Sequence, residues 1–263
     1  MADSSRFSVR RRDLMLSAAA LGALSAAGPA LARGGAPGRS ILLINPNSNE
    51  GATRSMAQLA EQAVAQAIGG SGLRVIGERN AGAPSLLTTP QDMVSAATGV
   101  VRIGRQAAKD PRIGAIIVSA FSDPGLDQLR QSVSIPVFGI GEQAFREAAR
   151  GGRPFAIATV TPDPGLIESF RQKAASLGYA AQYRGTLATE GDPKKLVEDP
   201  ALLDAALAKV VRTVIDKDGA QAVIMGGGPL SASAVRLQPQ FDVPLIVAVS
   251  AAARAAAAAI GGQ

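Results

Sequence analysis

The chain has 263 residues, of which 47% are hydrophobic, so it is long and apolar enough to bury the core of one large domain or two small ones. Aromatic residues make up only 3% and tryptophan is absent, so the core must consist mainly of Ala, Val, Ile and Leu. The net charge of +6 is not clustered into a basic stripe, and base-stacking aromatic patterns and zinc spacings are missing, so we expect no nucleic-acid partner.

Cysteine and histidine are both absent from the sequence. This excludes disulfides, thiolate nucleophiles, Ser-His-Asp triads and imidazole metal ligands. Any acid–base chemistry would fall to Asp, Glu, Lys or Tyr. The run Gly226-Gly227-Gly228 is not a phosphate loop, because no Gly-Lys-Ser/Thr follows it. We therefore expect neither a cofactor nor a metal site.

The first 32 residues have the pattern of an export signal. Residues 8–16 read SVRRRDLML, and this paired arginine, polar residue and apolar run resembles a twin-arginine signal. The weakly apolar run that follows is broken by glycine and Pro29 and ends in the small-x-small sequence Ala30-Leu31-Ala32. Such a run is too short and broken for a stable membrane anchor. We expect a signal peptide over 1–32, a flexible leader over 33–39, export in the folded state by the twin-arginine machinery, and a periplasmic location.

From residue 40 onward, short apolar runs alternate with helical patterns, which predicts parallel sheets covered by helices on both faces. Gly69 and Gly178 mark two helix ends, and Thr89-Pro90 opens a helix whose apolar face carries Met93, Ala97, Val100 and Ala107. Strands are expected at 41–45, 73–78, 115–119, 135–139, 154–159, 180–185, 222–226 and 244–248. Helices are expected at 48–68, from 89, and at 142–150, 165–177, 200–217 and 250–260.

The two halves of this pattern repeat one another. The segment AIIVSAFS, which starts at Ala115, is similar to AVIMGGGP, which starts at Ala222, and each is followed by a second strand with a proline. This indicates an internal duplication and predicts an α/β fold of two pseudo-symmetric lobes with parallel sheets and a ligand cleft between them. We place lobe 1 at 40–138 plus 248–263 and lobe 2 at 139–247. Four loops after strands should line the cleft, at 45–49, 119–123, 159–163 and 226–230.

Three of the motifs carry a family resemblance. Ile44-Asn45-Pro46-Asn47-Ser48, the run FSDPGLD from Phe121, and Gly139-Ile140-Gly141-Glu142 resemble, in this order, the hydantoin racemase branch of the Asp/Glu racemase superfamily. The resemblance extends over roughly 40–260. It implies a fold of two flavodoxin-like lobes with the ligand between them, a small carboxylate, amino-acid derivative or cyclic imide as that ligand, and possible homo-oligomers. The family mechanism that it implies uses two cysteine thiols on opposite faces of the substrate.

The sequence departs from that mechanism at both thiols. The resemblance places the first family cysteine at Ala120 and the second at Gly227. Neither side chain transfers a proton, so two-cysteine racemisation is not possible and this chain is a candidate pseudoenzyme. Asp123 and Glu142 are the remaining acid–base candidates near the cleft, because burial could raise the pKa of Glu142. The alternative for both is a first-turn carboxylate that a helix dipole favours.

The cleft loops offer polar groups that could hold a ligand, each with a structural alternative. Such groups are expected from the side chains or backbone of Asn45, Asn47, Ser48, Ser119, Ala120, Phe121, Ser122, Thr159, Thr161, Gly226, Gly227 and Gly228. The asparagines could instead form the turn around Pro46, and the serines and threonines could cap helices. The three glycines could bind an anion through their amides or simply allow a tight turn.

Two functional hypotheses remain open from the sequence. The protein could be an enzyme that acts on a small carboxylate or cyclic imide with a carboxylate as its base. It could equally be a non-catalytic periplasmic protein that binds such a compound, because capture in a cleft needs no proton-transfer group.

Overall fold

The computed structural model describes residues 40–69, 72–228 and 230–261. Gly35–Gln263 forms one compact unit. The expected signal peptide at 1–32 and leader at 33–39 lie outside the described residues. No helix within the described ranges is long and apolar enough to cross a membrane.

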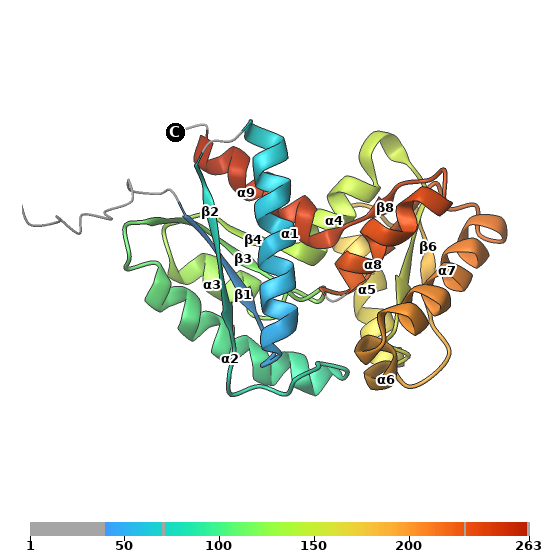
Figure 1. The fold of residues 1–263 in the computed structure, drawn as a ribbon, viewed down its shortest axis with the longest axis horizontal. Coiled ribbons are helices and arrows are strands. Elements are labelled where there is room, and N and C mark those ends of the chain that lie inside the picture. Colours follow the sequence, from blue (N-terminus) through green and yellow to red (C-terminus); the bar gives the residue numbers. More distant parts are fainter. Residues whose placement is uncertain (1–39, 70–71, 229, 262–263) are drawn as a thin grey trace, which may run out of the picture. The chain divides into compact units, whose positions relative to one another are not determined.

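The first half of the compact unit is a parallel sheet with helices, and its strand order is β2-β1-β3-β4 (Figure 1). Its elements are β1 (Ser40–Asn45), α1 (Glu50–Ile68), β2 (Arg74–Arg79), α2 (Pro90–Ala107), β3 (Ile113–Val118), α3 (Leu126–Ser132), β4 (Val137–Gly139) and α4 (Ile140–Ala148).

The second half repeats this order as β6-β5-β7-β8, again with parallel pairing. After a short 3-10 turn at Arg150–Gly152, it contains β5 (Phe155–Thr159), α5 (Pro164–Ser176), β6 (Tyr183–Ala188), α6 (Pro193–Glu198), α7 (Pro200–Asp216), β7 (Ala222–Met225), α8 (Leu230–Leu237), a 3-10 turn at Gln238–Gln240, β8 (Leu245–Ile246) and α9 (Ala248–Gly261). The two four-stranded parallel sheets confirm the predicted α/β fold, and their matching order supports the internal duplication. The exact boundaries of the two lobes stay a prediction.

Local sequence accounts for where several helices begin and end. Asn49 caps α1 by accepting from the Ala52 amide at 2.9 Å, and α1 ends at Gly69, whose φ of 60° is left-handed. Thr89 and Asp92 form a capping box around Pro90 at the start of α2.

The apolar face expected on α2 is only partly right. Val100 is buried, but the other buried positions are Ala96, Ile103 and Gly104.

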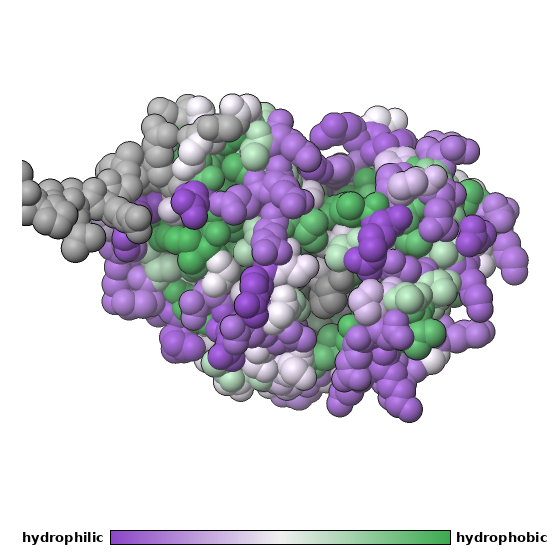
Figure 2. Space-filling model, viewed as in Figure 1, coloured by the Kyte–Doolittle hydropathy of each residue, from purple (hydrophilic) through white to green (hydrophobic). Residues whose placement is uncertain are grey.

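A shared aliphatic core connects the halves. One buried cluster includes Ile41 and Ile117 of the first sheet together with Ile157 and Ile224 of the second. Helix α4 contacts β4 of the first sheet and β7 and β8 of the second, so it helps to join the two sheets, and α9 packs against α1, α4 and β3. Burying this much apolar area provides most of the driving force for folding. Hydrophilic residues lie along the outer side of α1 and over much of the face drawn in Figure 2.

Several expected elements need correction. The strand expected at 180–185 is β6 at Tyr183–Ala188, because residues 179–182 form a turn in which the Gln182 amide donates to Tyr179. The strand expected from 135 begins at Val137, and the helix expected from 142 begins at Ile140. The strand at 244–248 is shortened to Leu245–Ile246, because α9 begins at Ala248. Helix α6 was not expected, and α3 and α8 were expected only as helix-length segments without bounds, because runs of six to eight residues are too short to show a clear helical period.

Candidate ligand-binding cavity

The loops that follow β1, β3, β5 and β7 meet at a cavity of about 70 Å³. In each sheet the strand order reverses between the two central strands, and ligands of open parallel sheets sit at the carboxyl ends of strands at such points. All four expected loops contribute at least one residue to the wall. The described residues that line the cavity are Asn47, Leu86, Leu87, Met93, Ser119, Ala120, Phe121, Ser122, Val160, Thr161, Leu166, Phe170, Val197, Gly226, Gly227, Gly228 and Leu230.

Nine of the residues expected at the ligand therefore lie in this wall, and three lie behind or beside it. Asn45 and Thr159 are buried behind the wall, and Ser48 is partly exposed beside it. Whether any of the nine contacts a ligand stays a prediction.

Asn45 organises the loop after β1. Its side-chain amide donates to Asn47 Oδ1 at 2.7 Å and to Thr53 Oγ1 at 2.9 Å, and its own Oδ1 accepts from the Asn47 backbone amide at 3.2 Å. Asn47 Oδ1 also accepts from the Asn49 amide at 2.9 Å. Asn45 thus orients Asn47, which lies in the cavity wall. The side-chain Nδ2 of Asn47 donates to no other described residue.

Thr159 has the corresponding role in the second half. Its hydroxyl lies 3.3 Å from the Gly226 carbonyl and accepts from the Thr161 amide at 3.2 Å. Thr159 is thereby committed to joining the loops after β5 and β7, while Thr161 lines the cavity.

The loop after β3 presents unused hydrogen-bond donors. The amides of Ala120, Phe121 and Ser122 donate to no other described residue, and the Ser122 Oγ atom is buried without a partner. Unused backbone amides beside a cavity suit a ligand that supplies acceptors, whereas the Ser122 Oγ atom has almost no accessible surface and does not face the open cavity. Ser119 differs, because its Oγ donates to the Met56 sulfur at 3.1 Å.

The three glycines after β7 are not equivalent. A Cβ at Gly226 would come within 2.7 Å of Ile157, and a Cβ at Gly228 within 2.4 Å of the Met56 sulfur. Among the described residues, a Cβ at Gly227 would contact Leu230, at an ordinary 3.4 Å. Close packing therefore accounts for Gly226 and Gly228, whereas position 227 has room for a side chain that faces the cavity.

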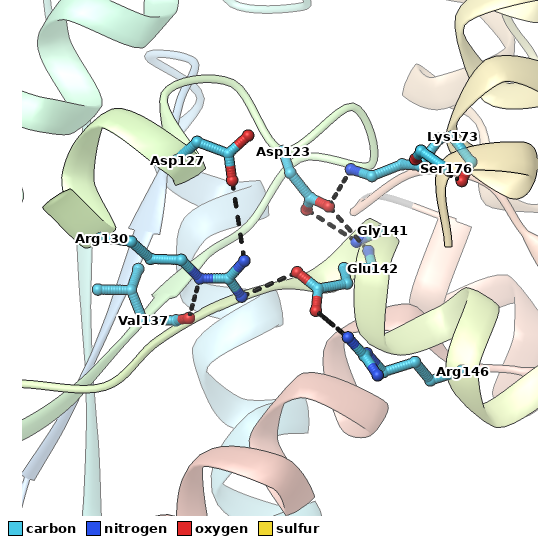
Figure 3. Close-up of polar contacts among 9 residues, drawn as sticks. All are labelled: Asp123, Asp127, Arg130, Val137, Gly141, Glu142, Arg146, Lys173 and Ser176. Atoms are coloured by element: carbon cyan, nitrogen blue, oxygen red, sulfur yellow. Dashed lines mark hydrogen bonds and ion pairs between the residues drawn. The ribbon is translucent and has the colours of Figure 1, made fainter. Parts of the chain in front are cut away.

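Asp123 and Glu142 lie outside the cavity wall and do not have the environment of free acid–base groups. Asp123 Oδ1 accepts from the Gly141 amide at 2.9 Å, and Oδ2 accepts from the Glu142 amide at 2.8 Å and from Lys173 Nζ. Figure 3 shows Asp123 between the amino end of α4 and Lys173, which reaches it from α5. Burial raises the pKa of Asp123, and the Lys173 ammonium and the two amides oppose that rise.

Glu142 is held by two arginines (Figure 3). Arg146 donates to Oε1 at 2.8 Å, and Arg130 reaches Oε2 at 2.8 Å. Burial alone would raise the pKa of Glu142, but the hydrogen bonds from Arg146 and Arg130 outweigh it and the pKa is lowered from 4.5. Glu142 is therefore a first-turn carboxylate of α4, as the structural alternative predicted, and Asp123 caps α4 from a distant loop.

Sequence reasoning missed the apolar part of the wall and the cations that hold the carboxylates. Leu166 and Phe170 lie one turn apart on α5 and both line the cavity. Their i, i+4 spacing was a signal that an apolar face of this helix pointed inward. Lys173 follows on the same helix, but its pairing with Asp123, 50 residues earlier, had no local signal.

A second, more open cavity of about 370 Å³ adjoins the first, because Asn47, Leu86, Val197 and Gly228 line both. The other residues of its wall include Asn49, Ser55 and Ser85, and α6 adds Lys194 and Glu198. In the described ranges, no three Asp or Glu side chains converge so as to hold a metal ion.

This fold and its cavity define a two-lobed α/β protein with a small-molecule cavity at the carboxyl ends of its strands. Residues 41–256 match the family described as Asp/Glu/Hydantoin racemase, and the chain belongs to that family.

Two hydantoin racemases are among its relatives. The chain is 27% identical to that of Paenarthrobacter aurescens over 221 residues, which covers 82% of this chain and 89% of the relative. It is 28% identical to that of Rhizobium meliloti over 221 residues, which covers 84% and 88%.

Solved structures show the same fold. Allantoin racemase from Klebsiella pneumoniae superposes with a TM-score of 0.76 at 24% identity, and 84% of this chain and 87% of that one are covered. Allantoin racemase from Pseudomonas fluorescens gives 0.74 at 20% identity, with 83% and 89% covered. An arylmalonate decarboxylase gives 0.55 at 16% identity, with 85% and 93% covered.

Proposed function

We propose that this protein binds a small cyclic imide, ureide or related amino-acid derivative in the cavity and does not racemise it by two-thiol chemistry. The observation that carries the proposal is the wall of the cavity. The described residues that line it are apolar or bear neutral amide or hydroxyl groups, and Ala120 and Gly227 stand where the family resemblance places its thiols. A wall of this kind can hold a ligand, but it offers no side chain that ionises near neutral pH to remove a proton.

The donors in the wall support this class of ligand. A cyclic imide or a carboxylate presents two or three oxygen acceptors. The free amides of Ala120, Phe121 and Ser122 and the Asn47 side-chain amide supply neutral donors for them. Leu87, Phe121 and Phe170 cover the faces of such a ring with apolar surface.

The adjoining cavity is the proposed place for a ring substituent. It opens from the first cavity at Asn47 and Gly228 and carries both a cation, Lys194, and an anion, Glu198. This mixture suits a polar substituent that can both donate and accept hydrogen bonds, such as an amide or a ureido group, better than a hydrocarbon.

Nuclear magnetic resonance in D₂O tests the proposal directly. Purified mature protein would be mixed with hydantoin, 5-substituted hydantoins, allantoin and N-carbamoyl amino acids, and the C5 or α proton would be followed against a protein-free control. We expect line broadening for at least one compound with no exchange above the control. Exchange above the control would contradict a purely binding role and would direct attention to Lys194 and Glu198. No broadening at millimolar concentration would reject this ligand class.

We also propose that the protein is exported in its folded state to the periplasm. The support is the run Arg10-Arg11-Arg12-Asp13-Leu14 ahead of a weakly apolar segment. Cell fractionation should find the full-length chain processed and periplasmic, and the double substitution Arg11→Lys/Arg12→Lys should leave it unprocessed inside the cell. Processing of the double variant as efficient as that of the wild type would reject the twin-arginine route.

A further inference from the structure

We propose that the ion pair between Asp123 and Lys173 is a positioning device that clamps the loop after β3 to helix α5 and so sets the width of the cavity. The inference concerns the shape of the cavity, and it rests on the proposed function only where a ligand is used to test it.

The first support is the way in which the fold makes room for Asp123. The residue has a φ of 52°, a left-handed conformation that non-glycine residues adopt infrequently, and its side chain is 1% exposed. A Cβ at Gly139 would lie 2.3 Å from the Asp123 carboxyl carbon, and a Cβ at Gly141 would lie 1.9 Å from the Phe121 carbonyl oxygen. Two glycines and an unusual backbone conformation thus accommodate one buried carboxylate.

The second support is the position of the pair relative to the cavity. Asp123 directly follows the wall residues Ser119–Ser122, and Lys173 lies one helical turn beyond Phe170 on α5. The Phe121 and Phe170 rings meet edge to face with their centroids 5.0 Å apart. The ion pair therefore joins, just behind the cavity, the two chain segments that bring these aromatic rings into its wall.

The third support is energetic. Burial raises the pKa of Asp123, so keeping its carboxylate ionised in the folded protein costs free energy despite Lys173 and the two amides. Buried ion pairs are often no more stabilising than apolar residues of the same volume, and they serve best where a fixed geometry is needed. A role in geometry explains this pair better than a role in stability.

The test uses the neutral pair Asp123→Asn/Lys173→Met, which removes both charges together and leaves neither one buried alone. Asparagine tolerates the left-handed backbone at 123. The matched control is Arg254→Met, which breaks the Glu147–Arg254 ion pair between α4 and α9, two helices that supply no residue to either cavity wall. If the double variant does not fold, Lys173→Gln replaces it.

The main readout needs no ligand. The full sequence has seven phenylalanines, so uniform labelling with fluorophenylalanine gives a ¹⁹F spectrum simple enough to assign by single substitutions. We expect the Phe170 and Phe121 signals of the double variant to shift or broaden, while Phe241 keeps its position. The Arg254→Met control should leave the Phe170 signal unchanged. Unchanged Phe170 and Phe121 signals in a folded double variant would overturn the inference.

A second readout links the clamp to binding. The ratio of dissociation constants for hydantoin and 5-benzylhydantoin should change by about three- to tenfold in the double variant, within the range of coupling between residues in contact, and should not change in the control. If neither compound binds any variant while the ¹⁹F signals move, the proposed ligand class fails and the clamp stands. If both compounds bind with an unchanged ratio and the ¹⁹F signals do not move, the clamp fails and the proposed function stands.

Discussion

Ala120 and Gly227 face one cavity from loops of the two halves of the duplicated fold. Position 120 already carries a Cβ in the wall, and among the described residues a Cβ at 227 would contact Leu230 at an ordinary 3.4 Å. A racemase needs an acid and a base on opposite faces of one carbon, and these two positions enter the cavity from different halves of the duplicated fold.

We therefore expect Ala120→Cys/Gly227→Cys to exchange the C5 proton of 5-substituted hydantoins in D₂O at least about 100-fold faster than the wild type, the lower end of the usual gain from positioned acid–base groups. Each single substitution should show much less, because one face would lack its partner. The control is Gly227→Ala in the wild-type background. A double variant that binds hydantoin but exchanges no faster than Gly227→Ala would show that the loss of the thiols is not what stops the reaction.

Glu142 gives a prediction about pH. Its pKa is lowered in the folded protein by Arg146 and Arg130, so the ionised form stabilises the fold. This contribution is complete above the ordinary value of 4.5 and is lost as the pH falls through the lower folded pKa. Glu142→Gln should cost about 1–2 kcal/mol of unfolding free energy at pH 7, because both arginines are partly exposed. Urea denaturation should show the gap between the two proteins narrowing below pH 4.5 and unchanged between pH 6 and 8.

At the scale of elements, the junction between β4 and α4 is built around the loop after β3. Gly141→Ala should lower the unfolding free energy by about 1–3 kcal/mol. The new Cβ would overlap the Phe121 carbonyl oxygen, so the loop after β3 must move. Gly227→Ala is the matched comparison, since its Cβ makes only ordinary contacts, and it should change stability by less than about 0.5 kcal/mol. Thermal denaturation measures both. Equal effects of the two substitutions would show that the loop yields without cost.

The sequence allowed the regular elements to be predicted, because periodicity and helix-capping residues are local signals. The strand at 41–45, the Gly69 helix end and the capping residues around Thr89 all depend on residues within one or two turns. The errors have physical causes of another kind. Helices such as α3 and α6 are shorter than two full turns, and the start of β6 is displaced by the turn at 179–182, which the sequence pattern did not reveal.

The loops that form the candidate site could be predicted from the sequence. The hydrogen-bond and ion-pair partners of their residues could not. Duplication and strand order located the four loops, since parallel strands bring their carboxyl ends to one edge of a sheet. The roles of Asp123 and Asn45 depended on which partners the folded chain brought to them. Lys173 lies 50 residues from Asp123, and the two amides that Asp123 caps belong to another helix. A sequence shows which residues carry a charge. It does not show which distant residue pairs with that charge in the folded chain.

At the scale of the whole molecule, the two halves share a core and should unfold together. Phe145 of α4 is fully buried, stacks with Phe121 at 5.7 Å and meets Phe155 of β5 edge to face at 5.6 Å. Its ring thus joins the loop after β3 to the central strand of the second sheet. Removing it leaves a cavity in the interior that both halves share, and Phe145→Ala should cost about 3–5 kcal/mol.

The chain itself provides the probes for this cooperativity. Tryptophan is absent and the two tyrosines, Tyr179 and Tyr183, both belong to the second half, so tyrosine fluorescence reports on that half while far-ultraviolet circular dichroism reports on all helices. We expect the two guanidinium transitions to coincide in the wild type and to move together in Phe145→Ala. Separate midpoints in the wild type would mean that the halves are independent domains. Separation only in the variant would instead identify Phe145 as a contact through which the two halves stabilise each other.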